Sequence, residues 1–211
     1  MELLVVVGII GVLLGILLPV VHRARRQAVI VRCAANLHQV AIAFNNYLID
    51  SHNIVFWRGA DVSIDGMDWY VWGGRETGNF DTDQQNLFNR IVPRPLNIYV
   101  GGNLALFQCP ADNASTSYWT FGSAHWEWVG NSYNFNATGS PDTATPATSD
   151  GLAGVQFSTV PDPATMILFL DAGLVYPGDW HGNLNGNILL CDGHVAFGKI
   201  PTAGMRSDFR W

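Results

Sequence analysis

Residues 3–18 read LLVVVGIIGVLLGILL, a run without a single polar side chain. With the Pro-Val-Val that follows, the apolar segment covers residues 3–21, about nineteen positions, which is near the lower limit for a helix that crosses a membrane. One acid, Glu2, precedes the run, and arginines follow it. A cleaved secretory signal has the opposite order, with basic residues first and a small-residue cleavage site after the apolar stretch. We therefore expect the segment to be retained.

The helical pattern continues beyond the apolar run. Apolar residues recur at spacings of three and four over about five turns, and these are Ile30, Cys33, Leu37, Val40, Phe44 and Tyr47. We assign the opposite face to Arg32, Asn36, Gln39 and Asn46. The sequence thus predicts one helix of roughly 50 residues and roughly 75 Å, ending near residues 50–53 and locally weakened at Pro19. Its first half is apolar all round and its second half is amphipathic.

Beyond this helix, short apolar runs alternate with turn residues, which predicts a small antiparallel sheet with long loops. The runs lie at residues 97–100, 166–170, 187–190 and 194–197. Asp192-Gly193 separates the last two and favours a two-residue hairpin turn. Residues 138–151, rich in Thr, Ser and Pro, predict an exposed loop. The expected fold class is therefore α+β, divided into an apolar helix (1–21), its amphipathic continuation (22–52) and a β-rich head (53–211).

Charge is distributed unevenly along the chain. Residues 1–49 carry a net charge of +3 and residues 50–211 a net charge of −9. An acidic head has no electrostatic reason to bind nucleic acid. Four arginines, at positions 23, 25, 26 and 32, follow the apolar run. They suit either a cytoplasmic membrane face, where positive residues gather, or a solvated face of the helix.

The N-terminal segment has the features of a known family. Residues 2–13, ELLVVVGIIGVL, with Pro19 seventeen positions after Glu2, closely resemble the N-terminal signature of type IV pilins and type II secretion pseudopilins. In that family a short basic leader is cleaved and the new N-terminus is methylated. This chain has only Met1 before Glu2, so neither step is visible in its sequence.

Further segments resemble one bacterial branch of pilin-like proteins. They are RCAANLHQ at 32–39, RPLN at 94–97 and FQCPAD at 107–112. The branch also carries a His followed, about nine residues later, by Asp-Gly-His. Here that stretch runs from His181 to Asp192, Gly193 and His194, with ten residues between His181 and Asp192.

The resemblance implies a type IV pilin-like fold and a structural role. The subunit would be stored in the inner membrane, handled by pilus or secretion assembly machinery, and polymerised with copies of itself into an extracellular filament. A pseudopilin of a type II secretion system is the alternative. Glu2 would pair with the N-terminal amine of a neighbouring subunit, because an unpaired carboxylate in hydrocarbon is costly. Gly8, Gly11 and Gly15 would let helices approach closely, and Pro19 would weaken the helix beside them.

Three cysteines, Cys33, Cys109 and Cys191, allow one disulfide and a free thiol, or three thiols. There is no CxxC pair, so we expect no structural zinc. Cys33 and Cys109 both lie in the family-like segments, and an extracytoplasmic head would sit in an oxidising compartment. The resemblance therefore implies a Cys33–Cys109 disulfide, with Cys191 left as a buried thiol.

Residue types in the head are compatible with two rival functions. Asp171, His181, Asp192 and His194 are residue types of metal and acid–base sites. No nucleophile motif or phosphate loop accompanies them, so we expect a turn-forming role, no enzyme activity and no cofactor beyond a structural calcium ion. The eight tryptophans suit a glycan-binding head, but more often such residues fill a core or a subunit interface.

Overall fold

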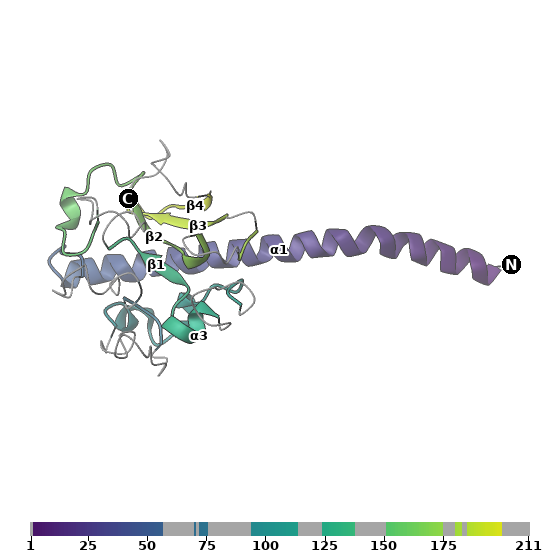
Figure 1. Ribbon diagram of the computed structural model, residues 1–211, viewed down its shortest axis with the longest axis horizontal. Helices are drawn as coiled ribbons and strands as arrows, with labels where there is room; N and C mark the ends of the chain where they lie inside the picture. The colour runs from purple at the N-terminus through teal and green to yellow at the C-terminus, as the bar shows by residue number, and fades with distance from the viewer. Residues whose placement is uncertain are drawn as a thin grey trace.

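One helix runs the length of the molecule and carries the head on its C-terminal half. In the computed structural model, α1 spans Glu2–Asp50 without interruption (Figure 1). Besides α1, the structure describes residues 51–56, 70, 72–75, 94–113, 124–137, 151–174, 180–182 and 185–199. The prediction of a single helix ending near residue 50 is confirmed. Pro19 lies inside α1, and the projecting half of the helix is continuous and gently curved (Figure 1).

The helix ends because the next residues leave helical geometry. His52 and Asn53 both have positive φ, at 56° and 66°, a conformation that Asn tolerates better than most residues. The backbone N–H of Asn53 donates to the carbonyl of Leu48 at 2.7 Å, which satisfies one of the last helical acceptors. The chain then turns back along the helix toward the head.

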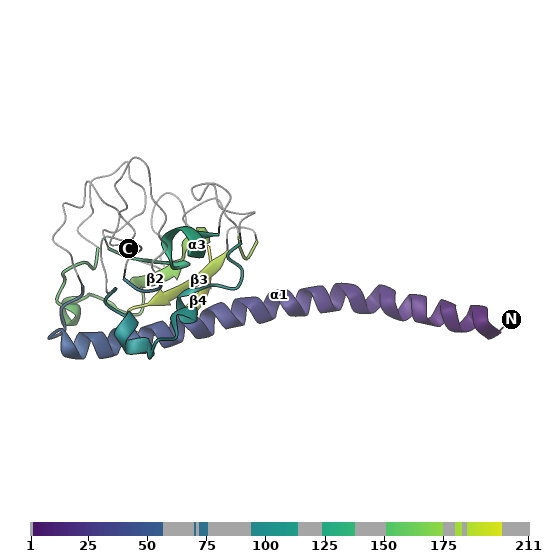
Figure 2. The same cartoon turned by 90° about the horizontal axis from the view of Figure 1, so that it is seen from below.

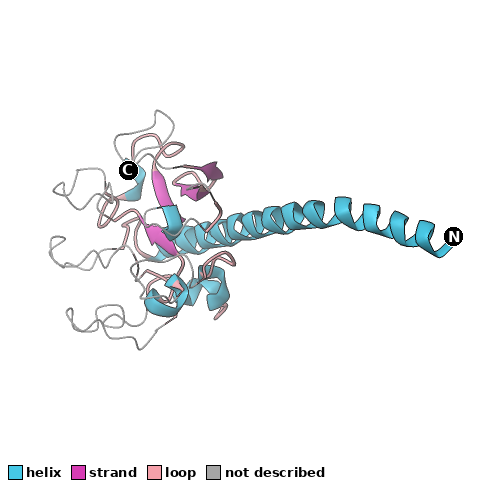
Figure 3. Cartoon of the chain, turned by 45° about the vertical axis from the view of Figure 1, so that its right-hand side comes forward, coloured by secondary structure: helices cyan, strands magenta, loops and turns pink. Residues whose placement is uncertain are grey.

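The head is built on a four-stranded antiparallel sheet in the order β1-β2-β3-β4. Its strands are β1 Tyr133–Phe135, β2 Ile167–Asp171, β3 Gly186–Leu190 and β4 Val195–Gly198. Every residue of β1, β2 and β3 is buried, whereas β4 is a partly exposed edge. Figures 2 and 3 show the sheet gathered over the C-terminal half of α1, with the N-terminal half projecting away from it. The α+β class is confirmed.

Short helices complete the described part of the head. They are α3 His125–Val129 and four 3-10 turns, η3 Asn97–Val100, η4 Leu104–Phe107, η6 Phe157–Thr159 and η7 Ala172–Leu174. The sequence predicted a strand at 97–100, and this was wrong. The Asn97 side chain instead pairs with both backbone groups of Gly74, at 2.9 and 2.7 Å. Gly101 then ends the turn in the left-handed conformation.

The hydrophobic core lies between α1 and the sheet. From α1 it takes Cys33, Leu37, Val40 and Phe44, all fully buried, with Ile30 at the margin and Tyr47 half-buried. The Phe44 ring packs edge-on against Phe56, Phe157 and Phe169, with centroids 5.4–6.0 Å apart. The predicted helix stripe therefore does face the head.

One residue of the predicted polar face is misplaced. Asn36 is buried, and its side-chain amide donates to the carbonyl of Gln108 at 2.9 Å. Its position three residues after Cys33 puts it on the core side of the helix. The other three residues, Arg32, Gln39 and Asn46, are exposed as predicted.

The last hairpin also differs from its prediction. β3 ends at Leu190 and β4 begins at Val195, so the connection is longer than the predicted two residues. Gly193 has the expected positive φ, 93°. The backbone N–H of Leu190 donates to the carbonyl of His194 at 3.0 Å. This bond closes the loop next to the last strand pair, Leu189 with Val195. Of the predicted loop at 138–151, residues 138–150 lie outside the described residues.

Candidate functional site

The projecting half of α1 presents an apolar surface that nothing in the described chain covers. Its fourteen large apolar side chains from Leu3 to Val20 are each 49–80% exposed. A Cβ placed on Gly8, Gly11 or Gly15 would meet no atom within 4 Å. By length and composition, α1 is the one described helix that could cross a membrane. The side chain of Glu2, where α1 begins, lies outside what the structure describes.

A second apolar stripe, which the sequence reading missed, follows the outer side of α1 beside the head. Val31, Ile42 and Ile49 are 64, 62 and 76% exposed. Their spacings of eleven and seven residues return to one side of a 3.6-residue helix. This stripe lies opposite the buried residues and prolongs the exposed surface of the projecting half. The spacing of these three residues could have predicted this stripe, but the buried stripe has more apolar residues and was the one assigned.

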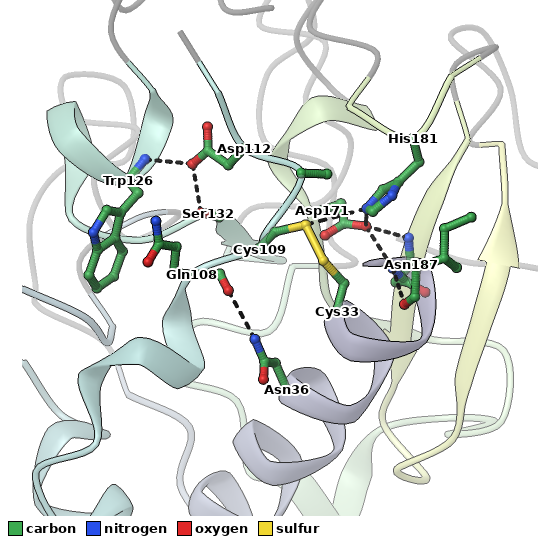
Figure 4. The surroundings of a disulfide bond; sticks show 12 residues. Cys33, Asn36, Gln108, Cys109, Asp112, Trp126, Ser132, Asp171, His181 and Asn187 are labelled. Carbon is green, nitrogen blue, oxygen red and sulfur yellow. Dashed lines mark hydrogen bonds and ion pairs between the residues drawn. A yellow bond between two sulfur atoms is a disulfide. The ribbon is translucent and has the colours of Figure 1, made fainter. Parts of the chain in front are cut away.

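A disulfide joins the buried side of α1 to the head. Cys33 on α1 and Cys109, just after η4, have Cα atoms 5.2 Å apart and bonded sulfur atoms (Figure 4). The hydrogen bond from Asn36 to Gln108 lies one turn further along the helix. Together these two links attach the FQCPAD segment to the RCAANL segment. The linked residues are 76 positions apart in the chain.

A buried polar cluster adjoins this disulfide. The Asp171 carboxylate, at the end of β2, lies 3.1 Å from His181 Nε2 through its Oδ2 atom. The same oxygen accepts the backbone N–H of Asn187 at 2.6 Å and its side-chain amide at 3.1 Å. His181 Nε2 also lies 3.4 Å from Cys109 Sγ. Asp171, His181 and Asn187 are each at most 3% exposed. We call Cys33, Cys109, Asp171 and His181 the disulfide centre.

One buried polar atom of the cluster is left without a hydrogen bond in the part of the chain that the structure describes. Asp171 Oδ1 is buried and has no hydrogen-bond partner among the described residues. Burial, and next the negative charge of Asp171, raise the pKa of the nearby Tyr133 hydroxyl well above its usual value. Tyr133 therefore stays neutral at any physiological pH. The four members of the disulfide centre offer donor atoms that all lie within 4.8 Å of one another.

Arg26 fastens the His181 segment to α1. Its guanidinium donates from Nε to the His181 carbonyl at 3.1 Å, and from Nη2 to the same oxygen. Gly182 has a φ of 82°, and a Cβ there would collide with this guanidinium. Arg26 therefore lies with the head.

A second carboxylate, Asp112 of the FQCPAD segment, organises α3. It accepts the backbone N–H groups of His125 and Trp126 at 2.8 and 2.6 Å and the Ser132 hydroxyl at 2.7 Å. Burial raises the pKa of Asp112 in spite of these bonds. Burial also lowers the pKa of His125, whose Nδ1 lies 2.7 Å from the Asn131 carbonyl. The segment thus ties the disulfide to β1 through local polar contacts.

The C-terminal His/Asp-Gly-His residues separate into two places. His181 is buried in the disulfide centre, whereas Asp192 and His194 are exposed in the β3–β4 turn. Asp192 Oδ1 accepts the backbone N–H of His194 at 3.0 Å, and its carboxylate contacts His194 Nδ1 at 2.7 Å. Slight burial raises the pKa of Asp192, but the hydrogen bonds from His194 outweigh it and the net shift is downward. The turn residues therefore serve the turn itself, and Asp171, not Asp192, is the partner of His181.

The remaining predicted groups are placed as follows. Cys191 is a buried free thiol, and burial raises its pKa to about 12, so it is not a reactive thiolate. Of the tryptophans in the described residues, Trp72 is fully buried and Trp126, Trp128 and Trp180 are half-buried. Trp57, Trp69, Trp119 and Trp211 lie outside the described residues.

Comparisons with known proteins found no relative of this chain. No protein-family profile, no curated protein and no solved structure matches it. The function proposed below therefore rests on residues and contacts of the chain itself.

Proposed function

We propose that this chain is a type IV pilin-like filament subunit, held in the membrane by the projecting half of α1 and polymerised by packing these helices together. One observation carries the proposal. A single helix presents fourteen exposed apolar side chains over its first half and forms the spine of a folded head with its second half. A membrane anchor alone explains the first half, but the uninterrupted rigid connection to the head suits a rod that assembles with others.

The energetics favour assembly by packing. Moving a large apolar side chain out of water stabilises by about 1.5 kcal/mol or more. In the membrane these side chains already lie in lipid, so their transfer out of water contributes nothing further to assembly. Helix association must then come from close packing, which Gly8, Gly11 and Gly15 permit, and from pairing the Glu2 carboxylate.

The second apolar stripe, which we call the outer stripe, supports the same proposal at the level of the head. Val31, Ile42 and Ile49 are exposed on the side of α1 that faces away from the sheet. In a bundle of α1 rods, this side is the one left available to neighbouring subunits. The stripe thus allows helix contacts to continue past the apolar run. The assembled filament would appear on the cell surface, delivered by pilus or secretion machinery.

The disulfide centre suits a head that must stay on its rod. A filament under load pulls each head against its helix. The Cys33–Cys109 disulfide joins the head to α1 covalently, and Arg26 joins them by hydrogen bonds to His181. Both links resist this pull in addition to the hydrophobic core.

Replacing Glu2 with Ala tests the proposal. We expect the head to stay folded and the subunit to stay in the membrane, because neither depends on this carboxylate. The yield of filaments sheared from cells, counted by electron microscopy, should fall sharply. Asp50→Ala is the matched control, since it removes a carboxylate from the other end of α1 and, among the described residues, one hydrogen bond, that from Tyr99.

Three outcomes separate the readings. Filament loss in Glu2→Ala but not in Asp50→Ala supports the proposal. Normal filaments in both variants contradict the role of Glu2. Cells that express the wild-type chain and shed no filaments made of it contradict a major pilus subunit and favour a secretion pseudopilin.

A further inference from the structure

The disulfide centre combines four metal-binding side chains from distant parts of the chain. Cys33 comes from α1, Cys109 from the loop after η4, Asp171 from the end of β2 and His181 from the segment before β3 (Figure 4). Their donor atoms all lie within 4.8 Å of one another, and all four side chains are buried. A disulfide alone requires neither the imidazole nor the carboxylate beside it.

We propose that the reduced form of this centre binds one zinc ion, with the two cysteine thiolates, His181 Nε2 and the Asp171 carboxylate as ligands. Thiolate, imidazole and carboxylate are the ligand types that Zn²⁺ takes in proteins, and four ligands complete its tetrahedron. The proposal concerns the head alone and does not depend on whether the chain assembles into filaments.

The existing distances are close to those a zinc ion requires. With Zn–S bonds of about 2.3 Å and Zn–N or Zn–O bonds of about 2.0 Å, neighbouring ligand atoms lie roughly 3.3–3.8 Å apart. Cys109 Sγ and His181 Nε2 are 3.4 Å apart, and the Asp171 carboxylate, whose Oδ1 atom would ligate, comes within 3.1 Å of His181 Nε2 through its Oδ2 atom. The main movement is the separation of the two sulfur atoms once their bond is broken.

The surrounding contacts prepare the ligands. Asp171 Oδ1 has no hydrogen-bond partner among the described residues and is available to a cation. Asp171 Oδ2 is held by the backbone and side chain of Asn187, an arrangement that orients ligating carboxylates in metal sites. Arg26 holds the His181 backbone in place from α1. His181 binds as the neutral imidazole, with its remaining proton on Nδ1.

Disulfide and zinc are then alternative links between the same two segments. A dithiol donates two electrons and two protons to the Cys33–Cys109 bond and becomes a disulfide itself, which leaves two cysteine thiols. Zn²⁺ displaces the two thiol protons and forms two Zn–S bonds. A disulfide oxidant reverses the exchange: it accepts two electrons and two protons and becomes two thiols, the Cys33–Cys109 bond forms again, and Zn²⁺ is released.

Cobalt binding to the detergent-solubilised full chain tests the proposal. The chain is reduced with a phosphine, titrated with Co²⁺ and then with Zn²⁺, in parallel with the oxidised chain. We expect one Co²⁺ per reduced chain, with a thiolate-to-cobalt charge-transfer band and the intense visible bands of tetrahedral cobalt. Zn²⁺ should displace it, and the oxidised chain should show neither band.

Variants identify the ligands. His181→Ala and Asp171→Asn should weaken cobalt binding more than tenfold, while Cys191→Ser, which removes the thiol outside the centre, should leave it unchanged. His181→Cys offers a zinc ligand in place of the imidazole, so it should retain tetrahedral cobalt with a stronger thiolate band even if His181→Ala fails to fold. Binding without the tetrahedral spectrum, equal binding by the oxidised chain, dependence on Cys191, or loss of the bands in a folded His181→Cys chain would overturn the proposal.

Discussion

The two halves of α1 contain the same kinds of apolar residue in opposite surroundings. From Leu3 to Val20 every large apolar side chain is about half exposed or more, whereas Leu37, Val40 and Phe44 are fully buried. No break in the helix separates them. The difference is therefore one of partners: the second half meets the sheet, and the first half meets nothing in the described chain.

This difference assigns separate tasks to the two halves. The second half belongs to the head's cooperative core, so a change there should alter the stability of the head. The first half contributes no contact to that core, so a change there should alter only what the helix does with lipid or with other copies.

The sharpest test compares Phe44→Ala with Leu17→Ala. Phe44 is fully buried among four other rings, so its truncation should lower the free energy of unfolding by about 3–5 kcal/mol. Leu17 is 55% exposed, and its truncation should change that free energy by less than about 0.5 kcal/mol. Urea unfolding of the detergent-solubilised chain, followed by tryptophan fluorescence, measures both. Similar losses would mean that the two halves are not energetically separate.

The next test removes the covalent link between α1 and the head. Cys33→Ser with Cys109→Ser opens a loop between residues 76 positions apart. The unfolded chain gains conformational freedom, and we expect the free energy of unfolding to fall by about 2–4 kcal/mol. Urea unfolding with a chelator present excludes any contribution from metal. Cys191→Ser, which closes no loop, is the control, and mass mapping under non-reducing conditions should find only Cys191 free.

Acidification should weaken the head through His125. Burial lowers the pKa of His125 below its ordinary value of 6.5, so below that pH the unfolded chain binds a proton that the folded head does not. Stability is therefore present above about pH 6.5 and falls with decreasing pH, with a slope of at most about 1.4 kcal/mol per pH unit for this group. The raised pKa of Asp112 acts in the opposite direction, because the folded head then holds that proton more tightly.

The His125 contribution can be isolated with a variant. His125→Asn removes the titrating ring, and its unfolding free energy should vary less between about pH 7 and pH 5.5 than that of the wild type. Denaturant unfolding at several pH values measures the two slopes. An unchanged slope would assign the acid sensitivity to another group.

The smallest effect on the head is expected at the outer stripe. Ile42 is 62% exposed, although it lies beside the buried Ala41 and Ala43. Ile42→Ser should change the free energy of unfolding by less than about 0.5 kcal/mol and yet reduce the yield of sheared filaments. Val40→Ser, on the buried side of the same turn, should destabilise the head. A stable Ile42→Ser chain that still forms normal filaments would remove the stripe from the assembly surface.

Local patterns in the sequence were sufficient for the elements that depend on local physics. The three-and-four spacing from Ile30 to Tyr47 predicted the buried side of α1, because a helix repeats every 3.6 residues wherever it packs. The runs at 166–170, 187–190 and 194–197 predicted three strands to within a residue. The run at 97–100 failed because it forms a 3-10 turn, and the Asn97 side chain bonds to the backbone of Gly74, which is distant in the chain.

The sequence by itself determined that this chain has a long apolar-to-amphipathic helix, an antiparallel head and two cysteines in the segments RCAANL and FQCPAD. Only the tertiary structure brought Asp171 and His181 beside Cys109 and sent Asp192 and His194 to an exposed turn. The physical reason is range. Helix and strand periodicity depend on neighbours a few residues apart. The disulfide centre joins groups up to 148 positions apart, from Cys33 to His181. These groups meet only because of how the sheet packs on α1.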